Sequence, residues 1–103
     1  MITFAAVLAR LPALEERRLR LWIAQDWVRP VHRGGELMFE DIDLARLHLI
    51  LDLQDSLEVG EAAVPVVLSL LDQLHATRRQ MRRLLDAMDA GTAEEILRRL
   101  ERR

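Results

Sequence analysis

Apolar residues recur at helical spacing along most of the chain, and two short helices are predicted near its start. The first is capped by Thr3, is ended by Pro12, and carries its apolar residues every three or four positions, at Phe4, Val7, Leu8 and Leu11. The second follows after a short gap and has charged residues on one side and an apolar side made of Leu14, Leu19, Trp22, Ile23 and Trp27. Two short helices joined by a tight corner predict a helix-turn-helix arrangement.

A β-hairpin is predicted directly after these helices. Pro30 ends the helical run, because the residue before a proline is pushed out of the α region. The pair Gly34-Gly35 readily adopts the positive φ angles of a two-residue hairpin turn, and it separates Val31–Arg33 from Glu36–Phe39. After a helix-turn-helix, such a hairpin is either a wing that contacts a DNA backbone or a connector that turns the chain toward the next helix.

A third helix is predicted after the hairpin. Asp41 is its expected N-cap and Asp43 lies in its first turn, where both negative charges suit the helix dipole. Gly60 is its expected end. The apolar residues cover much of its circumference, so this helix is expected to be the most enclosed one; they are Leu44, Leu47, Ile50, Leu51, Leu53 and Leu57.

A fourth, longer helix is predicted from about Glu61 to Gly91, with Pro65 tolerated close to its first turn. From Val64 onward its apolar residues alternate three and four positions apart, as in a coiled coil. About 28 residues at roughly 1.5 Å each make about 40 Å, more than the rest of a small domain can cover. This surface is therefore expected to bind a second copy of the chain, unless it stays in water. The residues expected at the dimer interface are Leu71, Leu74, Arg78, Met81, Leu85 and Met88.

The last segment begins with Thr92-Ala93-Glu94-Glu95, which has the pattern of a capping box and predicts a short helix or a frayed tail. The chain as a whole is expected to form one mainly α domain: a winged helix-turn-helix with a small β-hairpin wing and a long C-terminal dimerisation helix. Its parts would be a winged helix-turn-helix unit over residues 1–60, the long helix over 61–90 and the last helix or tail over 91–103. Only four residues are aromatic, so the core is expected to be aliphatic.

Candidate catalytic and metal-binding residues are few. The chain contains no Cys, Lys, Tyr or Asn, and it has no glycine-rich phosphate loop. His32, His48 and His75 are not at the spacing of metal ligands. Trp22 and Trp27 are expected in the core and not at a cofactor site. We therefore expect a non-enzyme without cofactor or metal; lacking a membrane-spanning stretch, it should be soluble and cytoplasmic.

The net charge of −2 hides an uneven distribution of charge along the sequence. Residues 1–35 carry +3, residues 36–72 carry −8 and residues 73–103 carry +3, with arginine supplying every basic side chain apart from histidine. The acidic stretch is either a solvated face or a docking surface for a basic partner. For a docking surface, the best-placed acids of the third helix are Asp41, Asp52 and Asp55, joined by Glu58 and Glu61 at the corner. The partner is assigned to four of them, Asp52, Asp55, Glu58 and Glu61.

DNA binding is the alternative that the predicted wing raises. It requires several basic side chains on one face to neutralise phosphates. The candidates are Arg17, Arg18, Arg20 and Arg33. Glu15 and Glu16 stand at the groove-facing end of the same helix, and the neighbouring acidic stretch repels phosphates. Nucleic acid is therefore not the expected partner.

Three stretches carry a resemblance to a known family: "WVRP", the glycine hairpin "RGGELMF" leading into "FEDID", and "PVVLSLLDQL". From about Ile2 to Met88 the chain resembles the chaperone-modulator proteins of the CbpM type, which are themselves similar to the MerR DNA-binding domain. True MerR regulators carry Thr-x-Arg-Tyr-Tyr on the second helix. The comparable residues here are Arg20-Leu21-Trp22-Ile23, without the tyrosines that help to hold phosphates.

The resemblance implies a MerR-like helical fold and a protein partner. Modulators of this type bind the J-domain of a DnaJ-like co-chaperone, of the curved-DNA-binding protein A type, and restrain its stimulation of the chaperone DnaK. A J-domain presents a basic helix to an acidic region of DnaK, and an acidic modulator would compete for that helix. The expected function is thus inhibition of a co-chaperone without catalysis; the alternative is a small MerR-like transcriptional regulator that binds DNA.

Overall fold

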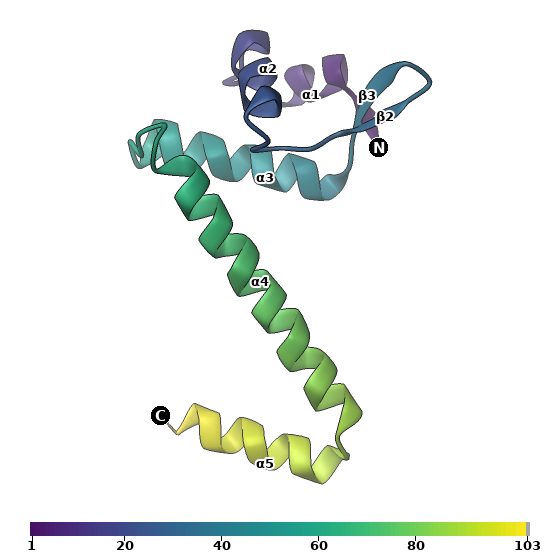
Figure 1. Ribbon diagram of the computed structural model, residues 1–103, viewed down its shortest axis with the longest axis vertical. Coiled ribbons are helices and arrows are strands. Elements are labelled where there is room, and N and C mark those ends of the chain that lie inside the picture. Colours follow the sequence, from purple (N-terminus) through teal and green to yellow (C-terminus); the bar gives the residue numbers. More distant parts are fainter. Residues whose placement is uncertain (103) are drawn as a thin grey trace. The chain divides into compact units, whose positions relative to one another are not determined.

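The computed structural model describes residues 1–102 and is mainly helical, with one small antiparallel sheet (Figure 1). It divides into two compact units, residues 1–68 and residues 69 onward. The first contains β1 (Ile2–Thr3), α1 (Phe4–Arg10), α2 (Glu16–Ala24), β2 (Val31–Arg33), β3 (Glu36–Phe39), α3 (Asp41–Leu51), the π-helical turn η1 (Asp52–Ser56) and the start of α4 (Val64–Ala87). The second contains the rest of α4 and α5 (Ala90–Glu101).

The first two helices begin and end much as their sequence predicts. The Thr3 hydroxyl accepts a hydrogen bond from the backbone N–H of Ala6 at 3.2 Å, which caps α1. α1 ends at Arg10, just before Pro12. α2 then starts at Glu16 and directs Leu19 and Trp22 into the core.

The predicted hairpin is confirmed, and the sheet contains one further strand. Gly34 and Gly35 have φ angles of 58° and 79°, and they form the turn between β2 and β3. The sheet order is β1-β3-β2, and both pairings are antiparallel. β1 was not predicted, because two residues are too few to show an alternating pattern.

α3 begins one residue earlier than expected, because Glu40 and not Asp41 is the N-cap. The Asp43 carboxylate accepts a hydrogen bond from the backbone N–H of Glu40 at 2.9 Å. The Glu40 side chain accepts one in return from the backbone N–H of Asp43, which completes a capping box. This reciprocal bonding explains why Asp43, an acidic residue, is buried at the start of the central helix.

The prediction that Gly60 ends the third helix is wrong. After Leu51 the helix widens into η1, where the backbone N–H of Leu57 donates to the carbonyl of Asp52 at 3.0 Å, five residues back. Glu58 then adopts a positive φ of 54°, so the helical run has already stopped before Gly60. The fourth helix starts at Val64 and not near Glu61, with Pro65 in its first turn as predicted.

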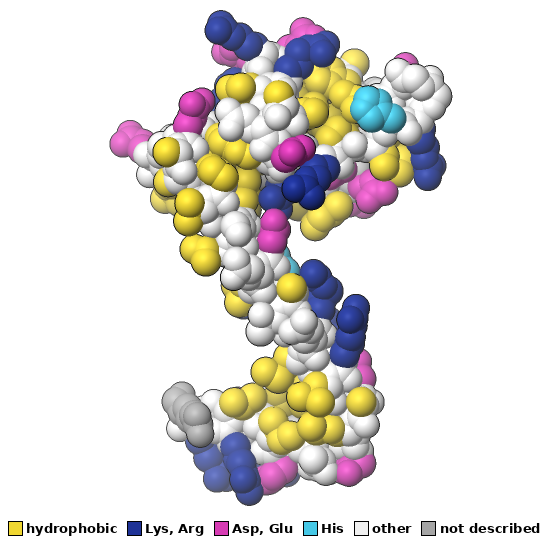
Figure 2. All heavy atoms as spheres, in the orientation of Figure 1, with side chains coloured by type: hydrophobic (Ala, Val, Ile, Leu, Met, Phe, Trp, Pro, Cys, Tyr) yellow, Lys and Arg dark blue, Asp and Glu magenta, His cyan; other side chains and the backbone are white. Residues whose placement is uncertain are grey.

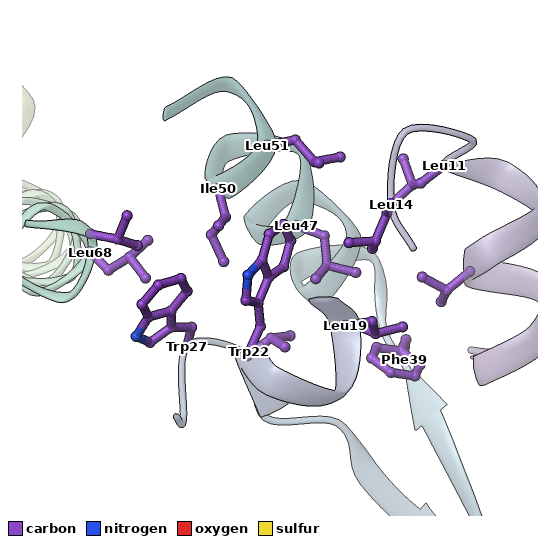
Figure 3. Packing of buried hydrophobic residues seen from close by; sticks show 13 residues of the cluster. Leu11, Leu14, Leu19, Trp22, Trp27, Phe39, Leu47, Ile50, Leu51 and Leu68 are labelled. Atoms are coloured by element: carbon purple, nitrogen blue, oxygen red, sulfur yellow. The ribbon is translucent and has the colours of Figure 1, made fainter. Parts of the chain in front are cut away.

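The core of the first unit surrounds α3, the most enclosed helix, as its apolar circumference predicts. Figure 3 shows Leu47 and Ile50 of α3 facing Trp22, with Trp27 lying beside Leu68. Trp22 and Trp27 are both buried, with ring centroids 6.3 Å apart, so neither stands at an open site. The guanidinium of Arg46 donates a hydrogen bond to the backbone carbonyl of Trp27, which fixes the segment after α2 against α3.

The second unit has no buried residue among those described from Ser69 onward. The last segment is a helix, α5, but its predicted start at Thr92 and the predicted helix end at Gly91 are wrong. α4 already ends at Ala87, and Asp89 is the N-cap of α5. The Asp89 carboxylate accepts hydrogen bonds from the backbone N–H and the hydroxyl of Thr92, both at 2.9 Å. Gly91 therefore lies inside the first turn of α5.

Candidate functional site

Acidic and apolar side chains come together where α3 gives way to α4. Asp52 and Asp55 lie on η1, and Glu58 and Glu61 lie in the connection to α4; all four are exposed. Two large apolar side chains belong to the same segment, Leu57 at 68% exposure and Val66 at 58%. We call these six residues the acidic corner. Figure 2 shows apolar side chains in yellow and acidic ones in magenta next to each other in this part of the first unit.

The local backbone explains why these side chains point outward. Leu53 is buried and anchors η1, whereas Asp52 and Asp55, on the other side of the turn, are exposed. The backbone N–H of Val59 donates to the carbonyl of Leu53 at 2.7 Å, which folds the chain back over the anchor. The positive φ of Glu58 turns the connection away from the helix axis, so Leu57 and Glu58 have no neighbour that buries them.

Asp55 is neutralised within the molecule. The Arg18 guanidinium of α2 donates to Asp55 at 3.0 and 3.2 Å and to the side-chain oxygen of Gln54 at 3.0 Å. The same guanidinium lies 5.1 Å from the centroid of the Trp22 ring, so the core holds it in place. Asp55 therefore offers a partner less uncompensated charge than sequence reasoning assumed.

Asp52, Glu58 and Glu61 have no hydrogen bond or ion pair of their side chains with any residue in the described part of the chain. They leave a local excess of three negative charges beside Leu57 and Val66. An exposed apolar pair with an uncompensated acidic rim is suited to binding a basic amphipathic segment.

The four candidate DNA-binding arginines do not form a free cationic face. Arg18 is bound to Asp55, and Arg20 is bound to Glu16 at 2.9 Å and lies 4.8 Å from the centroid of the Phe4 ring. Arg17 on α2 and Arg33 on β2 are exposed and have no ion pair within residues 1–102. Two of the four guanidinium groups are thus already committed to carboxylates of the same chain.

The residues predicted to join two copies lie along α4 in the second unit, except Met88, which lies in the turn after α4. Leu74 and Met81 are each 44% exposed, Arg78 is exposed, and Leu71, Leu85 and Met88 are half-buried. The start of the heptad pattern, Val64, lies instead in the core of the first unit. The same heptad spacing therefore begins with a residue in a closed core and continues with residues on an open surface.

The described residues contain no group of His, Asp and Glu side chains that could hold a metal ion. His32, His48 and His75 are all exposed and lie on different elements. Among the helices of the described chain, none combines the length and the apolar character needed to cross a membrane.

Sequence reasoning missed the two apolar members of the acidic corner. Leu57 was expected on the enclosed third helix, and Val66 was passed over because it lies outside the three-and-four spacing of α4. For Val66 a signal was present: two positions separate it from the buried Val64, and that offset places the two side chains on opposite sides of a helix. For Leu57 there was none, because its exposure follows from the π-helical turn.

Comparison of the chain with protein-family models, with curated proteins and with solved structures gives no match.

Proposed function

We propose that this protein is a non-catalytic modulator that binds the J-domain of a DnaJ-like co-chaperone, of the curved-DNA-binding protein A type, and limits its stimulation of DnaK. The observation that carries the proposal is the acidic corner, where Asp52, Glu58 and Glu61 are uncompensated beside the exposed Leu57 and Val66. The sequence resemblance to chaperone modulators supports the choice of partner.

The two kinds of side chain would have different roles in such a complex. Uncompensated carboxylates attract a basic helix, so they raise the association rate and orient the partner. Leu57 and Val66 supply apolar surface that loses water on binding, and apolar anchors usually contribute most of the affinity. Leu57 is therefore proposed as the central contact, with Glu58 and Glu61 on its rim.

A winged helix-turn-helix framework is part of the proposal. α1, α2 and the β2–β3 hairpin follow one another in the order of such a domain. In this chain the pairing of Arg18 with Asp55 and of Arg20 with Glu16 removes much of the positive charge that DNA would need. We propose that the framework has kept its shape and exchanged a nucleic-acid surface for a protein-binding one.

Isothermal titration of the full chain with the J-domain tests the proposal. The double variant Glu58→Arg/Glu61→Arg is expected to weaken binding by about tenfold or more. The matched control is Glu36→Arg/Asp41→Arg, which makes the same change of charge on β3 and at the first residue of α3, and it is expected to weaken binding by less than about threefold. Leu57→Asp should weaken binding by at least as much as the double variant, because the apolar contact is lost.

Three results would contradict the proposal. Equal weakening by both double variants would show that net charge, and not the acidic corner, governs binding. A wild-type chain that does not bind the J-domain would remove the function altogether. Tight retention on duplex DNA with a steep salt dependence, lost in Arg17→Glu/Arg33→Glu, would favour the transcriptional regulator.

A further inference from the structure

The second unit presents apolar surface that its own residues do not cover. α5 is apolar along one side, yet none of its residues is buried, and Leu97 and Leu100 are 44% and 48% exposed. Figure 2 shows apolar side chains gathered on one face of this unit. Isolated helices of about this length are marginal in water, because helices in proteins are stabilised mainly by packing of their apolar side. The second unit is therefore incomplete by itself.

The uncovered surface is a groove between α4 and α5. It has a volume of about 510 Å³ and is lined by Thr77, Arg78, Met81, Arg82, Leu85 and Asp86 of α4 and by Ala93 and Leu97 of α5. Met81, Leu85 and Leu97 form its apolar floor. From Thr77 to Asp86 the groove runs for roughly 14 Å along α4, which matches two and a half turns of a second helix.

The charge around the groove is positive and uncompensated. No side-chain hydrogen bond or ion pair joins any other described residue to the guanidinium groups of Arg78, Arg79, Arg82 and Arg83. The acids of α5 do not neutralise them, because Glu94 and Glu95 pair with Arg98 and Arg99 of the same helix, at 4.0 and 3.0 Å. Arg78, Arg82 and Asp86 follow one another along α4 at one-turn intervals in the lining of the groove.

We propose that this groove binds an amphipathic helix of a partner protein, with Asp or Glu on the part of the helix that meets Arg78 and Arg82. The helix would place apolar residues at i, i+3 or i+4, and i+7 against Met81, Leu85 and Leu97. Its carboxylates would neutralise the two guanidinium groups, which otherwise stay unpaired in the lining of the groove. This surface is independent of the acidic corner and of the proposed co-chaperone binding.

The arginines favour this partner over a second copy of the chain. A two-fold interface sets the same patch of both copies against itself. A parallel two-fold interface along this groove would bring Arg78 and Arg82 close to their own counterparts, and like charges in contact oppose association. An acidic helix removes the same charges and covers the same apolar surface.

Fluorescence anisotropy with two designed helical peptides tests the inference on the full chain. Both peptides carry leucine at i, i+3 and i+7; one has Glu along the flank and the other has Lys in its place. The Glu peptide is expected to bind at least about tenfold more tightly than the Lys peptide. Arg78→Glu/Arg82→Glu should reverse this preference, and Leu97→Asp should weaken both peptides by about tenfold.

The matched control is Arg79→Glu/Arg83→Glu, which makes the same change of charge on the same helix outside the groove lining. It should change the affinity for the Glu peptide by less than about threefold.

Equal loss of affinity in both double variants would show that the surface binds polyanions in general, and competition by duplex DNA would identify it as a nucleic-acid surface. Absence of binding up to about 1 mM would also overturn the inference. So would sedimentation as a dimer that Leu97→Asp dissociates, since a second copy would then occupy the groove. Circular dichroism of each variant confirms that the chain has folded.

Discussion

The Arg18 guanidinium donates a hydrogen bond to each carboxylate oxygen of Asp55, at 3.2 and 3.0 Å, across 37 positions of the sequence. The pair joins α2 to η1, so it links the second helix of the first unit to the acidic corner. Its side chains are 28% and 48% exposed, and the ring of Trp22 lies under the guanidinium. The two-pronged geometry is favourable, but solvent screens the attraction.

A double-mutant cycle of Arg18→Ala and Asp55→Ala should give a small coupling energy. We expect about 0.2–1 kcal/mol from urea unfolding, because the pair is partly exposed. The pair Arg20–Glu16, one turn apart on α2 and more exposed, serves as the comparison and should give about 0.3–0.5 kcal/mol. A coupling above about 2 kcal/mol for Arg18–Asp55 would mean that the pair behaves as a buried one.

Shortening one leucine in each unit should show that the first unit contributes more to the free energy of unfolding than the second. Leu47 is fully buried in the first unit, so Leu47→Ala is expected to lower the free energy of unfolding by about 2–5 kcal/mol. Leu97→Ala removes the same atoms from an exposed position of the second unit and should change it by less than about 0.5 kcal/mol. Chemical denaturation followed by tryptophan fluorescence measures the first change, since Trp22 and Trp27 lie in the first core. Far-UV circular dichroism, which reports the helices of both units, measures the second. A large loss for Leu97→Ala would show that the second unit already has a closed core.

The hairpin turn depends on the absence of a side chain at Gly35. Its φ of 79° lies in a region that L-residues avoid, so Gly35→Ala should destabilise the first unit by about 1–2 kcal/mol. Gly60 is the control, because it has no positive φ and a Cβ there would meet nothing within 4 Å. Gly60→Ala is expected to be neutral or stabilising by up to about 1 kcal/mol in thermal unfolding. Equal destabilisation by both substitutions would contradict this assignment.

The N-cap of α5 should make this helix sensitive to acid. The backbone N–H and the hydroxyl of Thr92 hold the pKa of the Asp89 carboxyl below its ordinary value of 3.8. A lowered folded-state pKa means that the stabilisation is complete above the ordinary value and is lost as the pH falls through the lowered one. Far-UV circular dichroism should therefore show loss of helix at strongly acidic pH.

The control for this pH dependence is Asp89→Asn, which keeps an oxygen that accepts the hydrogen bond but does not titrate. If Asp89 causes the acid response, the helix content of the Asn variant should be independent of pH over the same interval. Asp89→Ala should lower the helix content at neutral pH as well. A wild-type chain and an Asn variant with the same acid response would show that Asp89 does not cause it.

Much of the first unit could be predicted because local rules decide it. The Thr3 cap, the stop before Pro12 and the Gly34-Gly35 turn each depend on one residue and its immediate neighbours. The same holds for the burial of Trp22, which follows from its place on the apolar side of α2. Predictions of this kind need no knowledge of the rest of the chain.

The errors fall where two local rules compete or where contacts are distant. Asp89 and Thr92 are both good caps, and the carboxylate is favoured because it accepts two hydrogen bonds from Thr92. Glu40 is preferred to Asp41 because Asp43 bonds back to it. The partner of Asp55 could not be predicted at all, since no periodic pattern connects η1 with Arg18.

β2 has a further consequence for how this protein can associate. It is one of the two outer strands of the sheet order β1-β3-β2, and all three of its residues are exposed. A foreign strand that tried to extend the sheet would meet only three residues, two of them His32 and Arg33, directly after a proline. Edge-to-edge aggregation through β2 is thereby discouraged.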